Sequence, residues 1–151
     1  MSAQAETVRL ERVFAASPEE VFDAWTNPLV LQRWWGPRPD WDSPGCDVDL
    51  RVGGGYLLRM RNPESGTVLE VGGEYRVVER PRRLVYTWAW LGDSMPDAGQ
   101  DSLVTVEFLD EGERTRVVLE HAGLPTEASR IAHREGWEGC LSNLRGRVFG
   151  D

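Results

Sequence analysis

The chain has 151 residues, and 25 acidic against 17 basic side chains give it a formal net charge of −8. All seventeen basic residues are arginine, so Schiff-base, P-loop and general-base chemistry on a lysine is excluded. Nucleic acids and anionic membranes are bound through clustered cations, and this acidic composition argues against both partners.

The first part of the chain predicts one strand and two short helices. Thr7–Phe14 alternates apolar and polar side chains, as a half-buried strand does. Ser17-Pro18-Glu19-Glu20 combines an N-cap serine, a proline in the first turn and the glutamate of a capping box, so a helix begins here. Asn27-Pro28 ends that helix and caps a second one, which reaches Trp34-Trp35-Gly36-Pro37. This last motif either packs the helices against the sheet edge or gates a cavity.

The middle of the chain predicts a β-sheet. Turn residues separate six alternating segments: Cys46–Val52, Gly55–Asn62, Thr67–Glu79, Arg83–Leu91, Ser102–Leu109 and Thr115–His121. The connections are too short for crossover helices, so we expect antiparallel pairing. A longer polar loop covers Gly92–Asp101, and a helix is expected from about Thr126 to Val148. Without repeats or linkers, residues 1–151 are expected to form a single domain of the α+β class.

One face of the predicted sheet is apolar and aromatic. By alternation it carries Val48, Leu50, Tyr56, Leu58, Met60, Leu69, Val71, Tyr75, Val77, Leu84, Tyr86, Trp88, Trp90, Val104, Val106, Phe108, Val117, Leu119 and His121. The C-terminal helix has a matching stripe, formed by His133, Trp137, Cys140, Leu141, Leu144 and Val148. Both histidines therefore project between sheet and helix, where a curved sheet leaves room for a cavity.

Several motifs carry a family resemblance. They are Ser17-Pro18-Glu19-Glu20-Val21-Phe22 with Trp25, Trp34-Trp35-Gly36-Pro37, Asp49-Leu50-Arg51-Val52-Gly53-Gly54, Arg83-Leu84-Val85-Tyr86-Thr87-Trp88, and Gly136-Trp137 followed by Leu141 and Leu144. On these residues, nearly the whole chain resembles the bacterial homologues of the heat-shock-chaperone ATPase activator, in the START-like (SRPBCC), birch-pollen-allergen-like superfamily. The resemblance implies a helix-grip fold, in which a curved antiparallel sheet of six or seven strands wraps a long C-terminal helix and two short helices follow the first strand. It also implies a stress-response setting and the binding of hydrophobic small molecules.

The favoured hypothesis is a soluble protein that binds a small hydrophobic or aromatic molecule between the sheet and the C-terminal helix. The candidate ligand-binding residues are Tyr56, Leu58, Met60, Val71, Tyr75, Tyr86, Trp88, Trp90, Val104, Val106, Phe108, His121, His133, Trp137 and Leu141. The histidines and the tyrosine hydroxyls would orient the ligand. No cofactor and no metal is expected, because two cysteines and two histidines show no recognisable ligand spacing.

Two further functions stay open at this point. An enzyme such as a cyclase or hydrolase would use His121 or His133 as its base, although no acidic side chain shares the inward face. A protein-interaction or co-chaperone-like module, or a homodimer, would instead use an exposed apolar patch.

The expected location is the cytoplasm. Met1–Glu6 lacks the basic and apolar regions of a signal peptide, and no apolar run reaches about 18 residues. Cys46 and Cys140 are too few for a disulfide framework and are expected to be reduced, buried thiols.

Overall fold

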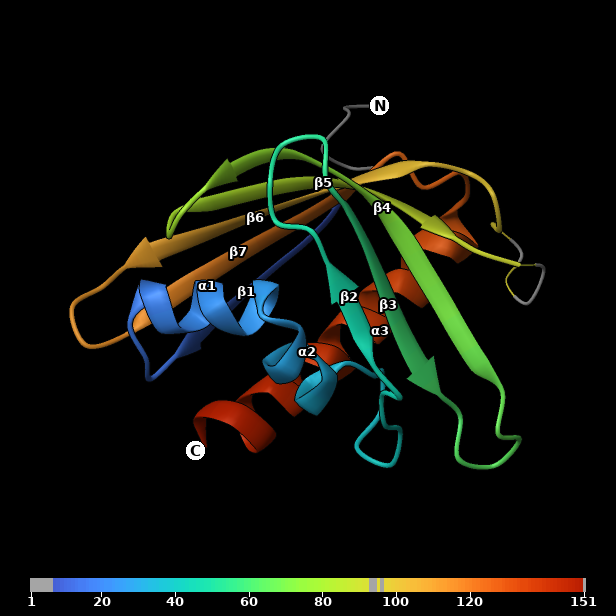
Figure 1. Cartoon of the computed structure of the whole chain (residues 1–151), viewed down its shortest axis with the longest axis horizontal. Coiled ribbons are helices and arrows are strands. Elements are labelled where there is room, and N and C mark those ends of the chain that lie inside the picture. The colour runs from blue at the N-terminus through green and yellow to red at the C-terminus, as the bar shows by residue number, and fades with distance from the viewer. Residues whose placement is uncertain (1–6, 93–94, 96, 151) are drawn as a thin grey trace.

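The structure is a computed structural model that describes residues 7–92, 95 and 97–150. The predicted polar start of the chain, residues 1–6, and residues 93, 94 and 96 of the predicted loop lie outside the described residues. The elements are, in chain order, β1 (Val8–Phe14), α1 (Pro18–Thr26), α2 (Pro28–Trp34), β2 (Cys46–Val48), β3 (Gly55–Arg61), β4 (Val68–Glu79), β5 (Arg83–Trp90), β6 (Ser102–Asp110), β7 (Thr115–Ala122) and α3 (Glu127–Leu144) (Figure 1). A π-helical turn, Arg145–Phe149, continues α3.

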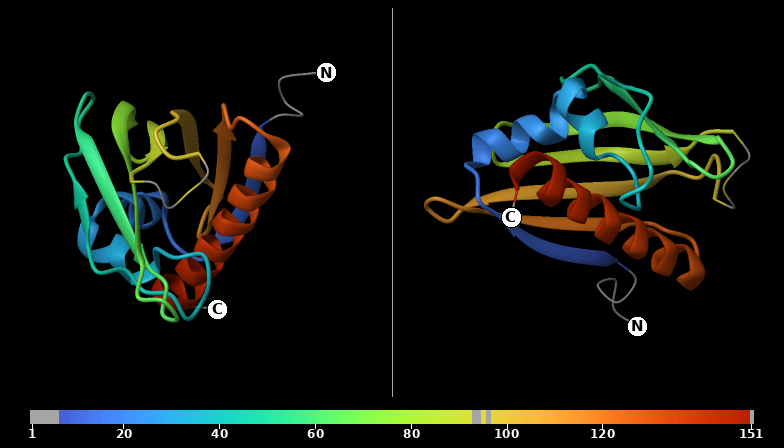
Figure 2. Two further views of the ribbon diagram at one scale, coloured as in Figure 1. Left: turned by 90° about the vertical axis from the view of Figure 1, so that its right-hand side faces the viewer. Right: turned by 90° about the horizontal axis from the view of Figure 1, so that it is seen from below.

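The strands form one seven-stranded antiparallel sheet in the order β1-β7-β6-β5-β4-β3-β2. The sheet is curved, and α3 runs across its concave side (Figure 2). This arrangement confirms the predicted α+β fold, with two short helices after the first strand and a long C-terminal helix. Among the described residues, no helix has the length and apolar character needed to cross a membrane.

The two short helices begin where the sequence motifs predict. The Ser17 hydroxyl accepts a hydrogen bond from the backbone N–H of Glu20, and the Glu20 carboxylate accepts one from the Ser17 N–H, both at 3.2 Å. Asn27 caps α2 by accepting from the N–H of Leu29 at 3.0 Å. Both caps satisfy donors that a helix start leaves unpaired, so the entry direction of each helix is fixed. The apolar sides of α1 and α2 can then close one end of the core.

Strand β4 departs from strict alternation at a bulge. Tyr75 pairs with Tyr86 and Val77 pairs with Val85, so Arg76 is an extra residue in the ladder. An extra residue reverses the face of every side chain beyond it. For this reason Val78 packs against the core, and the prediction that Val77 does so is wrong.

Strand β2 ends at Val48, earlier than the predicted Val52. Beyond it the chain turns back on itself, with hydrogen bonds from the N–H of Arg51 to the carbonyl of Asp49 and from the N–H of Gly54 to the carbonyl of Arg51. A Cβ at Gly54 would lie 2.2 Å from the Asp49 carbonyl oxygen, so only glycine permits this turn.

Strand β1 lies at the sheet edge, and arginines of the C-terminal segment cover its outer carbonyls. Arg134 of α3 donates to the carbonyl of Arg9 at 3.3 Å, and Arg145 donates to the carbonyl of Val13 at 2.7 Å. An uncovered edge invites pairing with another chain. The arginines therefore close this edge with side-chain donors, without any need for a further strand.

Candidate functional site

A cavity of about 230 Å³ lies between the sheet and α3. Its wall is almost entirely apolar and consists of Trp35, Pro37, Trp41, Met60, Leu69, Trp88, Trp90, Met95, Ala132, His133, Gly136, Trp137 and Cys140. The wall is mostly buried, whereas Pro37, Trp41, Leu69, Met95, Ala132 and Gly136 are partly or fully exposed and lie toward the mouth. The hollow is therefore open on one side.

Five of the fifteen predicted ligand-binding residues line this cavity. They are Met60, Trp88, Trp90, His133 and Trp137, from β3, β5 and α3. Their alternation on the strands and their helical spacing on α3 bring them to one place, as the sequence pattern indicated.

The predicted tyrosines lie elsewhere, at the end of the core near α1 and α2. Tyr56, Tyr75 and Tyr86, together with Leu58, surround a void of only about 10 Å³, which holds one water at most. The three rings pack against one another with centroids 5.1–5.9 Å apart. Burial raises the pKa of the Tyr75 and Tyr86 hydroxyls, so both stay protonated. These residues belong to the hydrophobic core and do not line the cavity between the sheet and α3.

The remaining predicted residues do not line the cavity. Val71, Val104, Val106, Phe108, His121 and Leu141 are each at most 2% exposed and belong to the packed interior.

His121 of β7 is held in one tautomer. Its Nδ1 accepts a 3.1 Å hydrogen bond from the indole Nε1–H of Trp137, which can only donate. The proton of the neutral ring is therefore on Nε2, 2.7 Å from the Ser102 hydroxyl oxygen. Burial, with a smaller contribution from His133, lowers the pKa of His121 to about 3.

His133 of α3 is held in the opposite tautomer. Its Nε2 accepts a 3.0 Å hydrogen bond from the Nε1–H of Trp90, and its Nδ1 lies 2.8 Å from the backbone carbonyl oxygen of Ser129, to which it donates. The two histidine rings stand edge to face, 5.1 Å apart. A tryptophan N–H thus occupies the basic nitrogen of each ring. Neither nitrogen is free to take a proton from a substrate.

A hydrogen bond ties the β5–β6 loop to α3 at the mouth of the cavity. The Ser129 hydroxyl donates to the carboxylate of Asp97, two residues after the cavity residue Met95. Ser129 is one helical turn before His133, so the loop, the helix and Trp90 form one connected chain of polar contacts.

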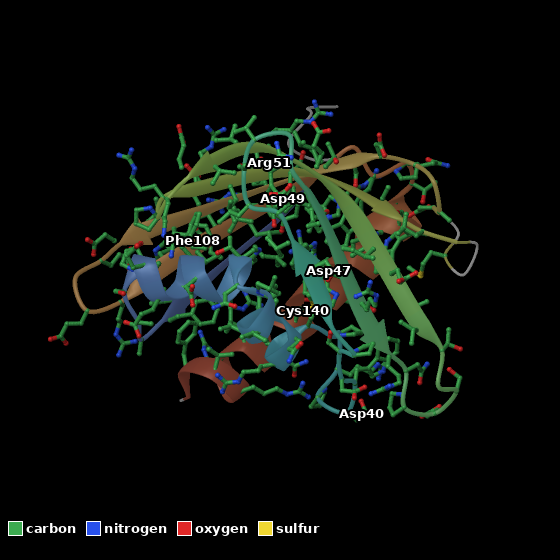
Figure 3. The ribbon with its side chains drawn as sticks, viewed as in Figure 1. Asp40, Asp47, Asp49, Arg51, Phe108 and Cys140 are labelled. Carbon is green, nitrogen blue, oxygen red and sulfur yellow. The ribbon has the colours of Figure 1, made fainter. Side chains whose placement is uncertain are left out.

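A second clamp holds the α2–β2 loop on α3. A Cβ at Gly139 would lie 1.8 Å from the Pro37 carbonyl oxygen, so the loop backbone rests directly on the glycine. Asn143 donates to the carbonyls of Gly36 and Arg38, both at 3.0 Å. In Figure 3, Asp40 marks the outer part of this loop and Cys140 lies inward of it, on α3.

This clamp accounts for three cavity residues that were not among the predicted ligand-binding residues. It fixes Trp35, Pro37 and Trp41 over one side of the hollow. Within the motif that was expected either to pack or to gate, Trp34 is core and donates to the carbonyl of Ala24 at 3.0 Å, whereas Trp35 is cavity wall. Gly139 and Asn143 were the available signals, although neither reveals its partner without the fold.

Two indole N–H groups in the wall, those of Trp35 and Trp88, are buried without a hydrogen-bond partner among the described residues. Both rings stand edge to face with neighbours, Trp35 at 75° to Trp137 and Trp88 at 87° to Trp90. Such crossings let an N–H meet the π face of another ring. The described residues contain no group of three or more His, Cys, Asp or Glu side chains that could hold a metal ion.

Comparison with known proteins gave a consistent result. The family model described as activator of Hsp90 ATPase homolog 1-like protein matches residues 15–148. A crystal structure of a protein from Chromobacterium violaceum is 29% identical, covering 97% of this chain and 99% of the other, with a TM-score of 0.80. The AHSA1 protein from Silicibacter pomeroyi is 32% identical over 91% of this chain and 94% of its own, with a TM-score of 0.79. A search of the curated proteins gave no match.

Proposed function

The chain belongs to the family of activator of Hsp90 ATPase homolog 1-like proteins, and we propose that it binds a small hydrophobic or aromatic molecule in the cavity between the sheet and α3. The observation that carries this proposal is the hollow itself. Folded cores pack densely and rarely keep a void larger than a water molecule. A hollow of about 230 Å³, walled by tryptophan, methionine and leucine side chains, has the apolar and aromatic lining that is typical of ligand pockets and so supports the proposal.

The size of the cavity limits the ligand. An apolar protein cavity of about 150 Å³ accepts benzene. The present one thus has space for one or two rings, with a longer substituent leaving through the mouth. Transfer of apolar surface from water into this wall contributes about 25 cal/mol per Å² before the cost of ordering the ligand.

The test uses indole and toluene as probes and follows the side-chain N–H signals of the seven tryptophans by NMR. Binding in the cavity is expected to shift the signals of Trp35, Trp41, Trp88, Trp90 and Trp137. The signals of Trp25 and Trp34, outside this cavity, are expected to move least. Equal shifts of all seven, or none with either probe, would overturn the proposal.

A matched pair of variants makes the test specific. Gly136 lines the cavity, and a Cβ there would meet no atom within 4 Å, so Gly136→Leu fills the hollow without a backbone collision. We expect it to abolish probe binding. Ala128→Leu adds the same side chain at an exposed position of α3 and should leave binding unchanged.

Catalysis is the weaker proposal. An enzyme using His121 or His133 as base would first have to break the hydrogen bond from Trp137 or from Trp90. Replacement of His121 by alanine separates the two proposals, because it would abolish a turnover while sparing ligand binding.

An interaction module or homodimer is a proposal of another class. Light scattering at several protein concentrations tests it, and a concentration-independent monomer mass would count against it. The free, buried thiols of Cys46 and Cys140 support the further proposal of a cytoplasmic, soluble protein.

A further inference from the structure

Five of the seven tryptophans of the chain gather on the wall of one cavity. They are Trp35, Trp41, Trp88, Trp90 and Trp137, contributed by the α2–β2 connection, by β5 and by α3. The π system of an indole carries negative charge on its faces, and tryptophan is the aromatic side chain that attracts a cation most strongly. Indole faces can therefore hold a cation as well as an aromatic ring, which aliphatic side chains cannot do.

Among the described residues, no arginine side chain lines the wall, and the chain has no lysine. Nε2 of His133 already accepts the Trp90 N–H, so this nitrogen has no free lone pair to offer a ligand. Nδ1 of His121, behind it, accepts the N–H of Trp137.

Among the described residues that line it, the wall has no carboxylate side chain to bind a primary ammonium ion. Such an ion carries three N–H donors and needs acceptors for them when it leaves water. The basic nitrogen of His133 is occupied, and burial raises the pKa of the Cys140 thiol to about 12, so the sulfur carries no negative charge. A fully methylated nitrogen has no N–H to satisfy, and its charge can rest on ring faces alone.

The charge around the mouth supports a cation as well. The Asp97 carboxylate lies on the loop that supplies Met95 to the wall, and it accepts a hydrogen bond from the Ser129 hydroxyl. The chain as a whole has a net charge of −8, which raises the local concentration of cations and lowers that of anions.

We infer that the natural ligand of the cavity is a small organic cation with a methylated quaternary nitrogen, such as a trimethylammonium group, held by the indole cluster. This inference rests on the proposed function, because it names the ligand class of the same cavity. It differs from that function in its consequence: charge, and not apolar surface alone, decides which molecule is bound.

Three molecules of nearly the same shape test it by calorimetry and by the indole N–H signals. Choline is the cation, 3,3-dimethylbutan-1-ol is its neutral carbon analogue, and 3,3-dimethylbutanoate is a related anion. Choline is expected to bind at least about fivefold more tightly than the alcohol, in line with the strength of buried cation–π contacts. The anion is expected not to bind.

The failures of the two proposals are distinguishable. If the alcohol binds as tightly as choline or more tightly, or if indole binds and choline does not, the inference is overturned and the proposed function stands. If neither indole nor any of the three molecules binds, both are overturned.

A variant at the mouth gives an independent readout. Trp41 is only partly buried, so its side chain can be changed with little effect on the core. Trp41→Leu should weaken choline binding by about threefold or more while changing the affinity for the alcohol less, and Trp41→Phe should restore part of the preference. Equal losses for choline and the alcohol in Trp41→Leu would contradict the inference.

Discussion

The indole N–H of Trp137 donates to Nδ1 of His121 across 3.1 Å, between the long helix and strand β7. This contact fixes the proton on the other ring nitrogen of a side chain that is 0% exposed, and so favours the neutral ring. This hydrogen bond joins α3 to β7, and only a neutral histidine ring can accept it.

The first prediction concerns how the stability of the folded protein depends on pH. The pKa of His121 is lowered to about 3 in the folded protein, whereas it is about 6.5 in an unfolded chain. Between these values the unfolded state binds a proton that the folded state does not, so stability is full above about pH 6.5 and falls as the pH decreases toward 3. Protonation of His121 in the unfolded state should lower the free energy of unfolding by about 2 kcal/mol between pH 7.5 and pH 5.

Urea denaturation at the two pH values measures this cost. His121→Gln removes the titrating ring, and its loss of stability between pH 7.5 and pH 5 should be smaller than that of the wild type by about 2 kcal/mol. Identical pH dependence in both proteins would contradict the assignment.

The second prediction concerns two glycines of α3. In Gly139→Ala the new Cβ would collide with the Pro37 carbonyl at 1.8 Å, so the helix and the α2–β2 loop must separate. We expect a loss of about 3 kcal/mol or more. Gly136→Ala meets no atom within 4 Å and should stabilise the helix by about 0.5–1 kcal/mol. The melting temperatures of both variants test this prediction. Shifts of the melting temperature in the same direction would contradict the close contact between Gly139 and the Pro37 carbonyl.

The third prediction concerns Asn143, whose amide group donates to two carbonyls of the same loop. Asn143→Asp keeps the shape but replaces the donor by a carboxylate, which faces two carbonyl oxygens. The expected loss is about 3 kcal/mol, with weaker indole binding as the loop loosens. At Asn62 the side chain uses its oxygen, accepting from the N–H of Glu64 at 2.9 Å, so Asn62→Asp should be nearly neutral in the same urea titration. Equal effects at the two sites would argue against the clamp.

The fourth prediction concerns the sheet edge. Arg134→Ala together with Arg145→Ala removes the donors to the carbonyls of Arg9 and Val13 and leaves the β1 edge open. We expect concentration-dependent association, measured by light scattering, because an open edge pairs with other chains. The exposed pair Arg82→Ala and Arg114→Ala is the control for the loss of two charges. A mass in the first variant equal to that of the wild type at every concentration would show that the arginines do not protect the edge.

Most of the fold could be predicted because its signals are local. The capping box at Ser17 and the alternation along Thr115–His121 act within a few residues, and the structure confirms both. The bulge in β4 has no such signal. Its extra residue, Arg76, lies in an ordinary alternating stretch, and the reversal of Val77 and Val78 is apparent only from the pairing with β5.

The site could be predicted only in part, for a related reason. Alternation indicates which face a side chain takes, but gives no information on how far along the sheet the core is filled. Tyr86 and Trp88 share one face of β5, yet the first packs among tyrosines and the second lines the cavity. Trp41 and Met95 reach the cavity from loops, which carry no periodicity.

The crowding of the indoles has an optical consequence. Trp88 lies 5.1 Å from Trp137, 5.5 Å from Trp90 and 5.9 Å from Trp35, and Trp34 continues the series to Trp25. At such separations the electronic transitions of neighbouring rings couple, and excitation passes among them before it is emitted. Ultraviolet absorption and fluorescence are therefore properties of the tryptophan cluster and not of single residues. A molecule that enters the hollow would change the absorption and fluorescence of the tryptophan cluster as a whole. The intrinsic fluorescence can therefore be used to follow ligand binding.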